Sequence, residues 1–145
     1  MKYKLTDVKI NFMGKTLFQI EAVKCFGDIV KGQKGGFIEK ESNLSQGGNA
    51  WVYGNAWVYG NAKVYGNAKV KGNADYLVIG PIGSRNDITT FFKTANNDIK
   101  VSCGCFTGTI EEFLEKVNET HGNNNYAKEY KTAVEIAKIH IFGGE

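Results

Sequence analysis

A short motif recurs every six residues in the middle of this 145-residue chain, and it constrains the fold more than any other feature. From Gly48 the sequence reads GNAWVY, GNAWVY, GNAKVY, GNAKVK and GNADYL. The alanine and the valine of each copy lie two residues apart, so they point to the same face of an extended segment. The Gly-Asn pair tolerates the left-handed backbone of a tight corner. The pattern therefore predicts short strands separated by two-residue corners.

A strand and corner of six residues fit a chain that coils on itself. Three such units would close a triangular turn of about 18 residues, which is the geometry of a β-solenoid. Residues 18 apart would then stack, which places Trp51 over Lys69, and the alanines and valines would fill the narrow interior. Upstream, Ile38 and Leu44 fall in phase with the alanines of the repeat. Residues 26–47 are therefore expected to form one irregular coil.

The repeats resemble the hexapeptide-repeat family of left-handed parallel β-helices, which combines an aliphatic residue, polar or glycine corners and a small residue in the same order. Together with the flanking segments, the resemblance implies a mainly β fold. We expect a short left-handed parallel β-helix that carries an N-terminal β-hairpin and a small α/β C-terminal domain of ββαα order.

Five aromatic side chains would lie on the exterior of such a solenoid. A row of exposed aromatic residues marks an interface more often than a ligand site. A short solenoid also exposes edges at its terminal coils. We therefore expect a homo-oligomer, with a trimer as the leading assembly, and ligand stacking on the same side chains as the alternative. The predicted interface or stacking residues are Trp51, Tyr53, Trp57, Tyr59 and Tyr65.

The segments on either side of the repeat give the domain organisation. Residues 2–24 read as two strands around a turn at Met13-Gly14, followed by Cys25 as a small core residue. Beyond the repeat come strand-like segments, a helix that starts at a Thr109/Glu112 capping box, and a second helix. The predicted domains are a hairpin cap, a β-helix and an α/β domain, at residues 1–25, 26–79 and 80–145.

The whole arrangement is similar to a group of phage- and prophage-encoded hexapeptide-repeat proteins. The similarity rests on Phe26-Gly27-Asp28, Gly35–Glu39 and Asn43-Leu44-Ser45, and on the segments GPIGSRND and CGCF of the second half. It implies a phage origin and a fold, but it brings no established reaction.

Catalysis is not expected. Enzymes of the hexapeptide-repeat family place histidines on their coils, whereas residues 22–80 contain no histidine. His121 is expected to cap the C-terminus of a helix. The thiols of Cys103 and Cys105 are too few for a zinc site, which needs four ligands, and are expected on a buried strand face. We therefore predict no catalytic residue, no metal and no cofactor, and a degenerate acyltransferase is a minor alternative.

The best candidate binding segment is Gly80–Asp87 with the residues that follow it. Its glycines allow the backbone to approach a ligand, and Pro81 restricts the entry to the loop. A hydroxyl and a guanidinium can bind a phosphate, and an aromatic ring can stack on a base. The alternative is a structural hinge. The predicted ligand-binding residues are Ser84, Arg85, Asn86, Thr89, Thr90 and Phe91.

Composition limits the remaining classes of function. A net charge of +3 gives no strong indication of nucleic-acid binding. No apolar run approaches the roughly 18 residues that cross a bilayer, the N-terminus lacks the apolar core of a signal peptide, and three cysteines do not suggest a secreted scaffold. We expect a cytoplasmic protein of an infected or lysogenic bacterium.

The leading functional hypothesis is a non-enzymatic anti-defence protein, which sequesters a nucleotide-derived immune signal in an oligomer. The alternative is a protein–protein inhibitor of a host defence protein, or a structural oligomerisation module.

Overall fold

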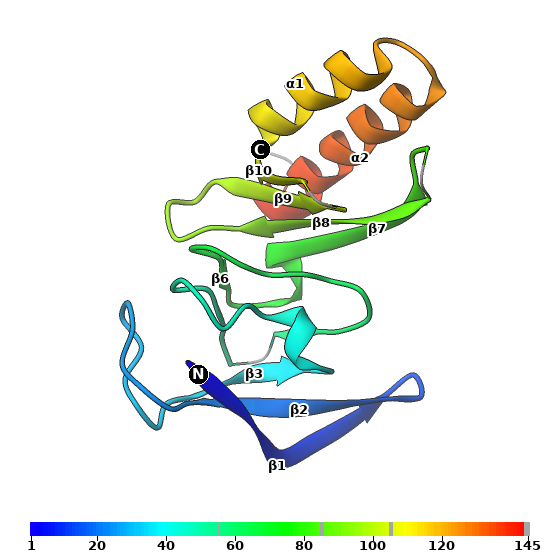
Figure 1. The fold of residues 1–145 in the computed structure, drawn as a ribbon. Helices are drawn as coiled ribbons and strands as arrows, with labels where there is room; N and C mark the ends of the chain where they lie inside the picture. Colours follow the sequence, from blue (N-terminus) through cyan, green and yellow to red (C-terminus); the bar gives the residue numbers. More distant parts are fainter. Residues whose placement is uncertain (55, 85, 105, 144–145) are drawn as a thin grey trace. The chain divides into compact units, whose positions relative to one another are not determined.

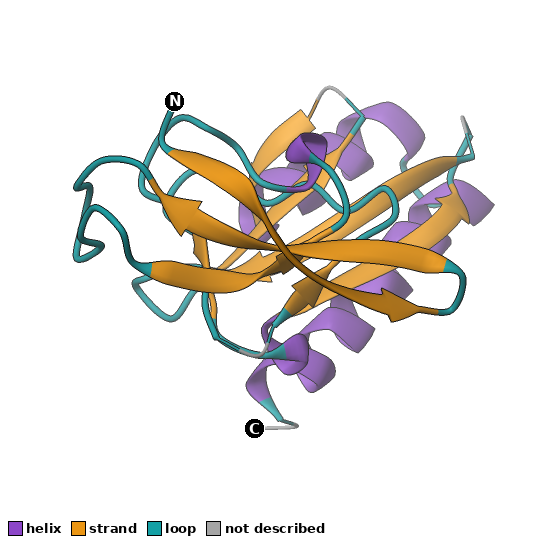
Figure 2. Cartoon of the chain, turned by 90° about the horizontal axis from the view of Figure 1, so that it is seen from below, coloured by secondary structure: helices purple, strands orange, loops and turns teal. Residues whose placement is uncertain are grey.

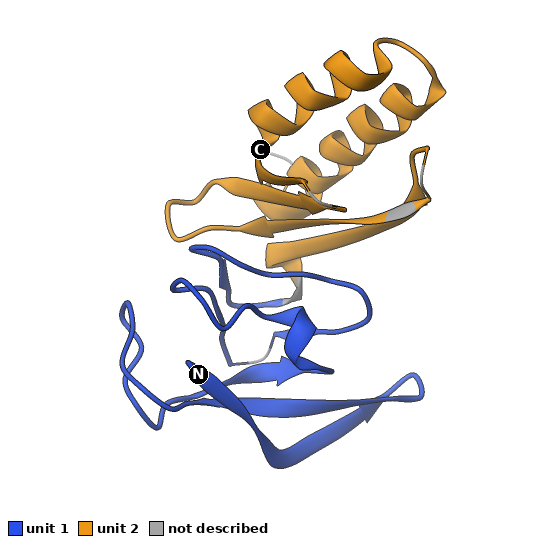
Figure 3. Ribbon diagram, viewed as in Figure 1, with its two compact units in different colours: residues 1–73 blue, residues 74–145 orange. Residues whose placement is uncertain are grey.

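The computed structural model describes residues 1–54, 56–84, 86–104 and 106–143. The chain divides into two compact units, residues 1–73 and 74–145, each with its own strands (Figures 1 and 3). The division falls within the last copy of the repeat, and the strand that follows it belongs to the sheet of the second unit.

The first unit is built from strands and one short 3-10 turn at Glu41–Asn43. Strands β1, β2, β3 and β5 form one sheet in that order, and β4 pairs with β6. The β1–β2 and β2–β3 pairs are antiparallel, whereas β3–β5 and β4–β6 are parallel. The strands are β1 (Tyr3–Phe12), β2 (Lys15–Ala22), β3 (Lys34–Ile38), β4 (Trp51–Val52), β5 (Trp57–Val58) and β6 (Lys69–Val70).

The predicted hairpin is confirmed by β1 and β2. Phe12 pairs with Lys15, and Met13 and Gly14 between them have φ angles of 49° and 78°. Two consecutive positive φ angles are typical of the type I′ loop, whose twist matches that of the flanking strands. The Met13-Gly14 reversal was therefore identified correctly from the sequence.

The spacing within the repeat is also confirmed. Trp51 pairs with Lys69 and Val52 with Val70, so residues 18 apart lie side by side as predicted. The alanines and valines of the first four copies are at most 2% exposed, and the glycines at their corners have positive φ angles. These inner residues are Ala50, Val52, Ala56, Val58, Ala62, Val64, Ala68 and Val70.

The predicted fold class, however, is wrong. Instead of a mainly β protein with a left-handed parallel β-helix at residues 26–79, the chain is mixed α/β, and its long strands pair antiparallel (Figure 2). The strands of the repeat are only two residues long, so they contribute little to the sheets. A six-residue period indicates where the corners of the chain lie and which residues point inward. It carries no information on how the flanking segments pair.

The predicted exterior position of Trp51 is wrong as well. Trp51 is fully buried, and its ring packs edge-on against Tyr3 at 6.3 Å and Phe26 at 5.4 Å between centroids. The other four aromatic residues of the row are half-buried. Trp57 and Tyr59 both contact the ring of Phe12, at 5.0 and 5.5 Å. The N-terminal hairpin and the residue-26 segment therefore cover aromatic rings that the period alone places outside.

Lys2 holds the N-terminus against the start of the repeat through hydrogen bonds. Its side chain is buried, and Nζ donates to the carbonyl oxygens of Gly47, Gly48 and Ala50 at 3.1, 3.5 and 2.7 Å. The same ammonium lies 5.0 Å from the centroid of the Phe26 ring. Burial, together with the charge of Lys24, lowers the pKa of Lys2 to about 8.

Cys25 does not occupy the core position that the sequence suggests. Its side chain is exposed, and its Sγ accepts a hydrogen bond from the Lys31 amide at 3.5 Å. Cys25 lies in the segment between the end of β2 at Ala22 and the start of β3 at Lys34, outside the strands of the sheet.

The second unit is one antiparallel sheet with two helices on the same side (Figure 1). The strand order is β10-β9-β8-β7, so the unit has four strands rather than the two of the predicted ββαα order. A 3-10 turn at Asn73–Asp75 leads into β7. The elements are β7 (Tyr76–Ile82), β8 (Asp87–Lys93), β9 (Ile99–Cys103), β10 (Phe106–Thr109), α1 (Ile110–His121) and α2 (Asn125–Phe142).

Helix α1 starts where the sequence predicts, and a second helix follows it as expected. Thr109 caps α1: its Oγ1 accepts from the Glu112 amide at 3.1 Å, and its own amide donates to the Glu112 carboxylate at 2.9 Å. These hydrogen bonds hold the pKa of Glu112 below its usual value. Gly122, at φ 60°, follows the last residue of α1. The helices pack on Phe91, Ile99 and Val101 of the sheet.

Replacing Gly36 should destabilise the first unit. A Cβ at Gly36 would lie 2.5 Å from the Ala56 carbonyl oxygen and 2.9 Å from that of Tyr53, and backbone atoms cannot move aside cheaply. We expect Gly36→Ala to lower the free energy of unfolding by about 2 kcal/mol. The measurement is urea unfolding followed by tryptophan fluorescence, since both tryptophans lie in this unit. Gly72→Ala is the control, because a Cβ there meets no atom within 4 Å; equal midpoints for the two variants would contradict the prediction.

Titration of Lys2 should appear in the pH dependence of stability. The pKa of Lys2 is about 8 in the folded chain and near 10.5 when unfolded, so between these values the unfolded chain binds more protons. The stability of the natural chain relative to Lys2→Met should therefore be lowest below pH 8 and rise by roughly 2 kcal/mol towards pH 10.5. Urea unfolding of both chains across this range measures the difference. Parallel curves would show that burial does not shift the pKa of Lys2.

Candidate functional site

The predicted ligand loop forms the turn between β7 and β8. Ile82 pairs with Asp87 across its base, and Ser84 and Asn86 are exposed at its tip. Both side chains are therefore accessible, as a binding loop requires. Arg85, the third predicted contact in the loop, lies outside the described residues.

The three remaining predicted contacts are not accessible. Thr89, Thr90 and Phe91 are at most 1% exposed, because β8 is an inner strand of the sheet. Phe91 belongs to the core beneath the helices, and the Thr89 hydroxyl donates to Cys103 Sγ at 3.3 Å. The prediction that these side chains contact a ligand is corrected accordingly: they pack inside the sheet, because the residues that follow the turn form strand β8.

Helix α2 holds the turn in place. The Gly83 amide donates to the Glu129 carboxylate at 3.0 Å. A Cβ on Gly83 would lie only 1.8 Å from the Tyr130 hydroxyl oxygen, so glycine is required for the turn to approach the helix this closely. These contacts favour the structural alternative for Gly80–Asp87 that the sequence left open.

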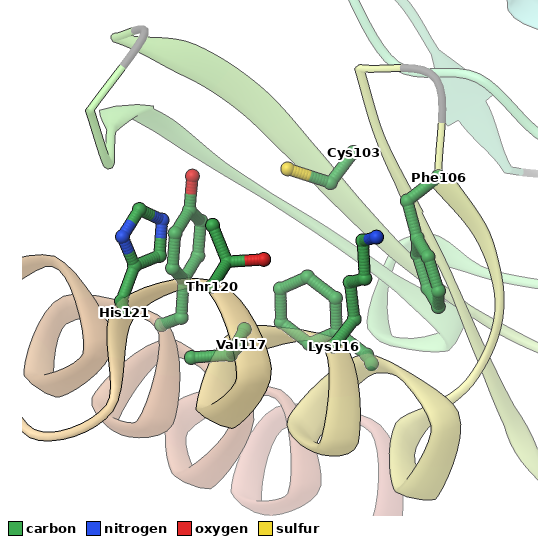
Figure 4. A pocket seen from close by; sticks show the side chains of 8 residues that line it. Cys103, Phe106, Lys116, Val117, Thr120 and His121 are labelled. Atoms are coloured by element: carbon green, nitrogen blue, oxygen red, sulfur yellow. The ribbon is translucent and has the colours of Figure 1, made fainter.

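A cavity of about 100 Å³ lies between the end of β9, β10 and the two helices (Figure 4). Aromatic and aliphatic side chains form much of its wall, and a thiol, an ammonium, an imidazole and hydroxyls open onto it. The lining residues are Cys103, Phe106, Phe113, Lys116, Val117, Thr120, His121 and Tyr130.

Aromatic contacts build the wall of the cavity. Phe113 of α1 contacts Phe106 at 5.5 Å and Tyr130 at 5.4 Å between centroids. His121 stacks on Tyr130 at 6.0 Å with 23° between the ring planes, and it contacts Tyr126 at 5.5 Å. Flat rings held in this way present faces and edges on which a planar ligand can pack.

The polar groups of the cavity come mainly from α1. Lys116, Thr120 and His121 follow one another along the helix at spacings of four and one residues, and Figure 4 shows all three on the cavity side. His121 lies in the last turn of α1, where the sequence predicts it and where the helix dipole favours a positive charge. An ammonium and an imidazole beside aromatic rings suit a flat molecule that carries negative charge.

A second hollow, of about 390 Å³, is lined by α1 and α2 residues. Its wall combines Leu114 and Val134 with Lys131, Thr132 and Glu135. The opposite charges of Lys131 and Glu135 give it no preference for a ligand of one sign. The smaller cavity, with two groups that can carry positive charge, is the better candidate site.

Within the described part of the chain, no three histidine, cysteine, aspartate or glutamate side chains come together as a metal site would require. In the same residues, neither helix has the length and apolar character needed to cross a bilayer. No protein-family model matches the chain, and no curated protein is significantly similar to it.

Sequence reasoning found His121 and Cys103 but gave them only structural roles, and it did not single out Lys116 or Thr120. The available signal was the spacing of Lys116 and Thr120, four residues apart on α1 and next to its apolar stripe. That signal is weak, because lysine is common on exposed helix faces whether or not they bind a ligand.

Loss of the Glu129 carboxylate should loosen the turn. We expect Glu129→Ala to increase amide hydrogen exchange at Gly83 about tenfold, because a hydrogen bond to a charged acceptor contributes about 1–2 kcal/mol. Exchange read by NMR at Gly83 is the measurement. Glu135→Ala on the same helix should leave that amide unchanged; if both variants exchange alike, Glu129 does not hold the turn.

Proposed function

We propose that the protein is a non-enzymatic binding protein whose α/β unit holds a small, flat, negatively charged molecule in the cavity between β9, β10 and the helices. The observation that carries this proposal is the combination of aromatic walls with Lys116 and His121 in one cavity. Flat apolar faces would bind the ring of the ligand, and the ammonium would pair with its negative charge.

The size of the cavity limits how much of a ligand can enter. At about 100 Å³ it is smaller than the roughly 300–1,000 Å³ of pockets that enclose drug-sized ligands. A ring would fit, while a longer polar part would remain outside near Lys116. A nucleotide-derived molecule has this division into a ring and an anionic part. We therefore keep a nucleotide-derived immune signal as the proposed natural ligand.

The biological setting that we propose follows from the sequence resemblance. A phage-encoded protein that sequesters such a signal in the bacterial cytoplasm would need affinity but no reaction. We also propose a homo-oligomer, most simply a trimer. Part of the predicted aromatic row supports this proposal, because four of its side chains are not fully covered within the chain: Tyr53, Trp57, Tyr59 and Tyr65.

Binding should depend on Lys116. Thermal-shift assays and calorimetry with cyclic nucleotides, ADP-ribose derivatives and benzoate should reveal at least one ligand, and Lys116→Gln should weaken its binding about tenfold. The reason is that a lost charge-assisted hydrogen bond costs about 1–2 kcal/mol. Lys128→Gln, which removes an exposed charge of α2 away from the cavity, is the matched control and should bind normally.

Two results would contradict the proposal. In the first, none of the probes shifts the melting temperature. In the second, Arg85→Ala abolishes binding while Lys116→Gln does not, which would place the ligand on the turn between β7 and β8.

A further inference from the structure

The thiol of Cys103 opens onto the candidate cavity. Cys103 is the last residue of β9, and it is half-buried. Figure 4 shows its sulfur on the side of the cavity where Thr120 and His121 lie. The hydroxyl of the fully buried Thr89, which pairs with Cys103 across β8 and β9, donates to Sγ at 3.3 Å, so the sulfur is held by a neighbour on the same face of the sheet. The thiol is therefore both positioned and accessible from the cavity.

The surroundings of this thiol suit one kind of reaction. Phe106 and Phe113 offer flat apolar surface, and the Lys116 ammonium opens onto the same cavity. A flat ligand that carries a carbonyl group could pack on the rings and direct its oxygen to Lys116. Negative charge that develops on that oxygen would then be stabilised by the ammonium.

We propose that Cys103 captures small, flat α,β-unsaturated carbonyl compounds by conjugate addition. The inference rests on the proposed function, because the same cavity would hold the ligand, and it adds a second class of flat ligand that would be retained covalently. The Cys103 sulfur forms a bond to the β-carbon, the electron pair of the carbon–carbon double bond forms a new double bond between the α-carbon and the carbonyl carbon, and the π pair of the carbonyl group moves to its oxygen to give an enolate. The thiol proton passes to solvent, and a proton from solvent returns to the α-carbon. The net change adds S–H across the double bond and needs no oxidant and no leaving group.

Cys25 provides an internal comparison. It is exposed, whereas Cys103 is half-buried, and among the described residues it lines neither the candidate cavity nor the hollow between the helices. If exposure alone set the rate of alkylation, Cys25 would react first. Capture in the cavity predicts the opposite order.

The test uses 2-cyclohexen-1-one on the full chain with Cys105→Ser, which leaves two thiols, and reads the adduct by intact-protein and peptide mass spectrometry. We expect one addition, at Cys103, about tenfold faster than at Cys25 and with a rate that saturates as the probe concentration rises. Fragment ions distinguish Cys103 from Cys105 in the natural chain, which should show the same order if Cys105→Ser disturbs the fold.

Two variants examine the groups around the sulfur. Lys116→Gln should lower the maximal rate about tenfold, and Lys128→Gln should leave it unchanged. Thr89→Val keeps the size of the side chain but removes its hydroxyl, so it should slow alkylation several-fold and alter the pH profile of the rate, with an unchanged circular dichroism spectrum. Equal rates at Cys25 and Cys103, or a rate at Cys103 that stays linear in probe concentration, would overturn the proposal.

The experiment also separates this inference from the proposed function. Protection of Cys103 by benzoate or a nucleotide, combined with slow and unsaturable alkylation, would support reversible binding and overturn covalent capture. Fast, saturable alkylation that no anion prevents would support covalent capture and overturn the preference for a negatively charged ligand. Cyclohexanone, which lacks the double bond, should slow the reaction by competition and should form no adduct.

Discussion

Close contact between backbone segments around the alanine and valine side chains is the constraint on which the first unit depends. Small inner residues let neighbouring strands of the repeat approach one another, and Gly35 and Gly36 of β3 have no room for a side chain against the backbone oxygens of residues 52, 53 and 56. The hairpin then docks through β2, and the buried Lys2 holds the N-terminus against three carbonyl oxygens of the repeat. A larger residue at the inner positions would separate all of these layers.

The tight packing of this interior costs stability through polar groups that are buried without a hydrogen bond. Within the described residues, the indole N–H of Trp51 and the side-chain oxygen of Asn67 are buried without a hydrogen-bond partner. Each such group costs about 1–3 kcal/mol relative to a satisfied one. The packing of Trp51 between Tyr3 and Phe26 offsets this cost through buried aromatic surface. Shape, more than hydrogen bonding, therefore selects the tryptophan at this position.

In the second unit, packing of α1 and α2 on the sheet produces the cavity. Phe113 fills the centre of the interface, and its contacts with Phe106 and Tyr130 leave a hollow beside the end of β9. Cys103 reaches this hollow from the sheet, and Lys116, Thr120 and His121 reach it from α1. The same alternation that buries Val101 directs Cys103 to the helix side, so a residue at the end of a core strand becomes part of the candidate site.

Local features of the chain were determined by the sequence alone. The Met13-Gly14 reversal, the inward alanines and valines and the Thr109/Glu112 cap follow from steric preferences or hydrogen bonds over a few residues, and the stacking of Trp51 on Lys69 follows from the six-residue period. Tertiary structure decided what depends on distant segments: the antiparallel sheets, the burial of Trp51 beneath residues 3 and 26, and the burial of Thr89, Thr90 and Phe91 in an inner strand. The cavity belongs to the second group. Its residues come from four elements spread over residues 103–130, and only the packing of helices on the sheet brings Lys116 and His121 next to Cys103. A pattern in sequence specifies which way a residue points, whereas the surface that it meets is set by the rest of the fold.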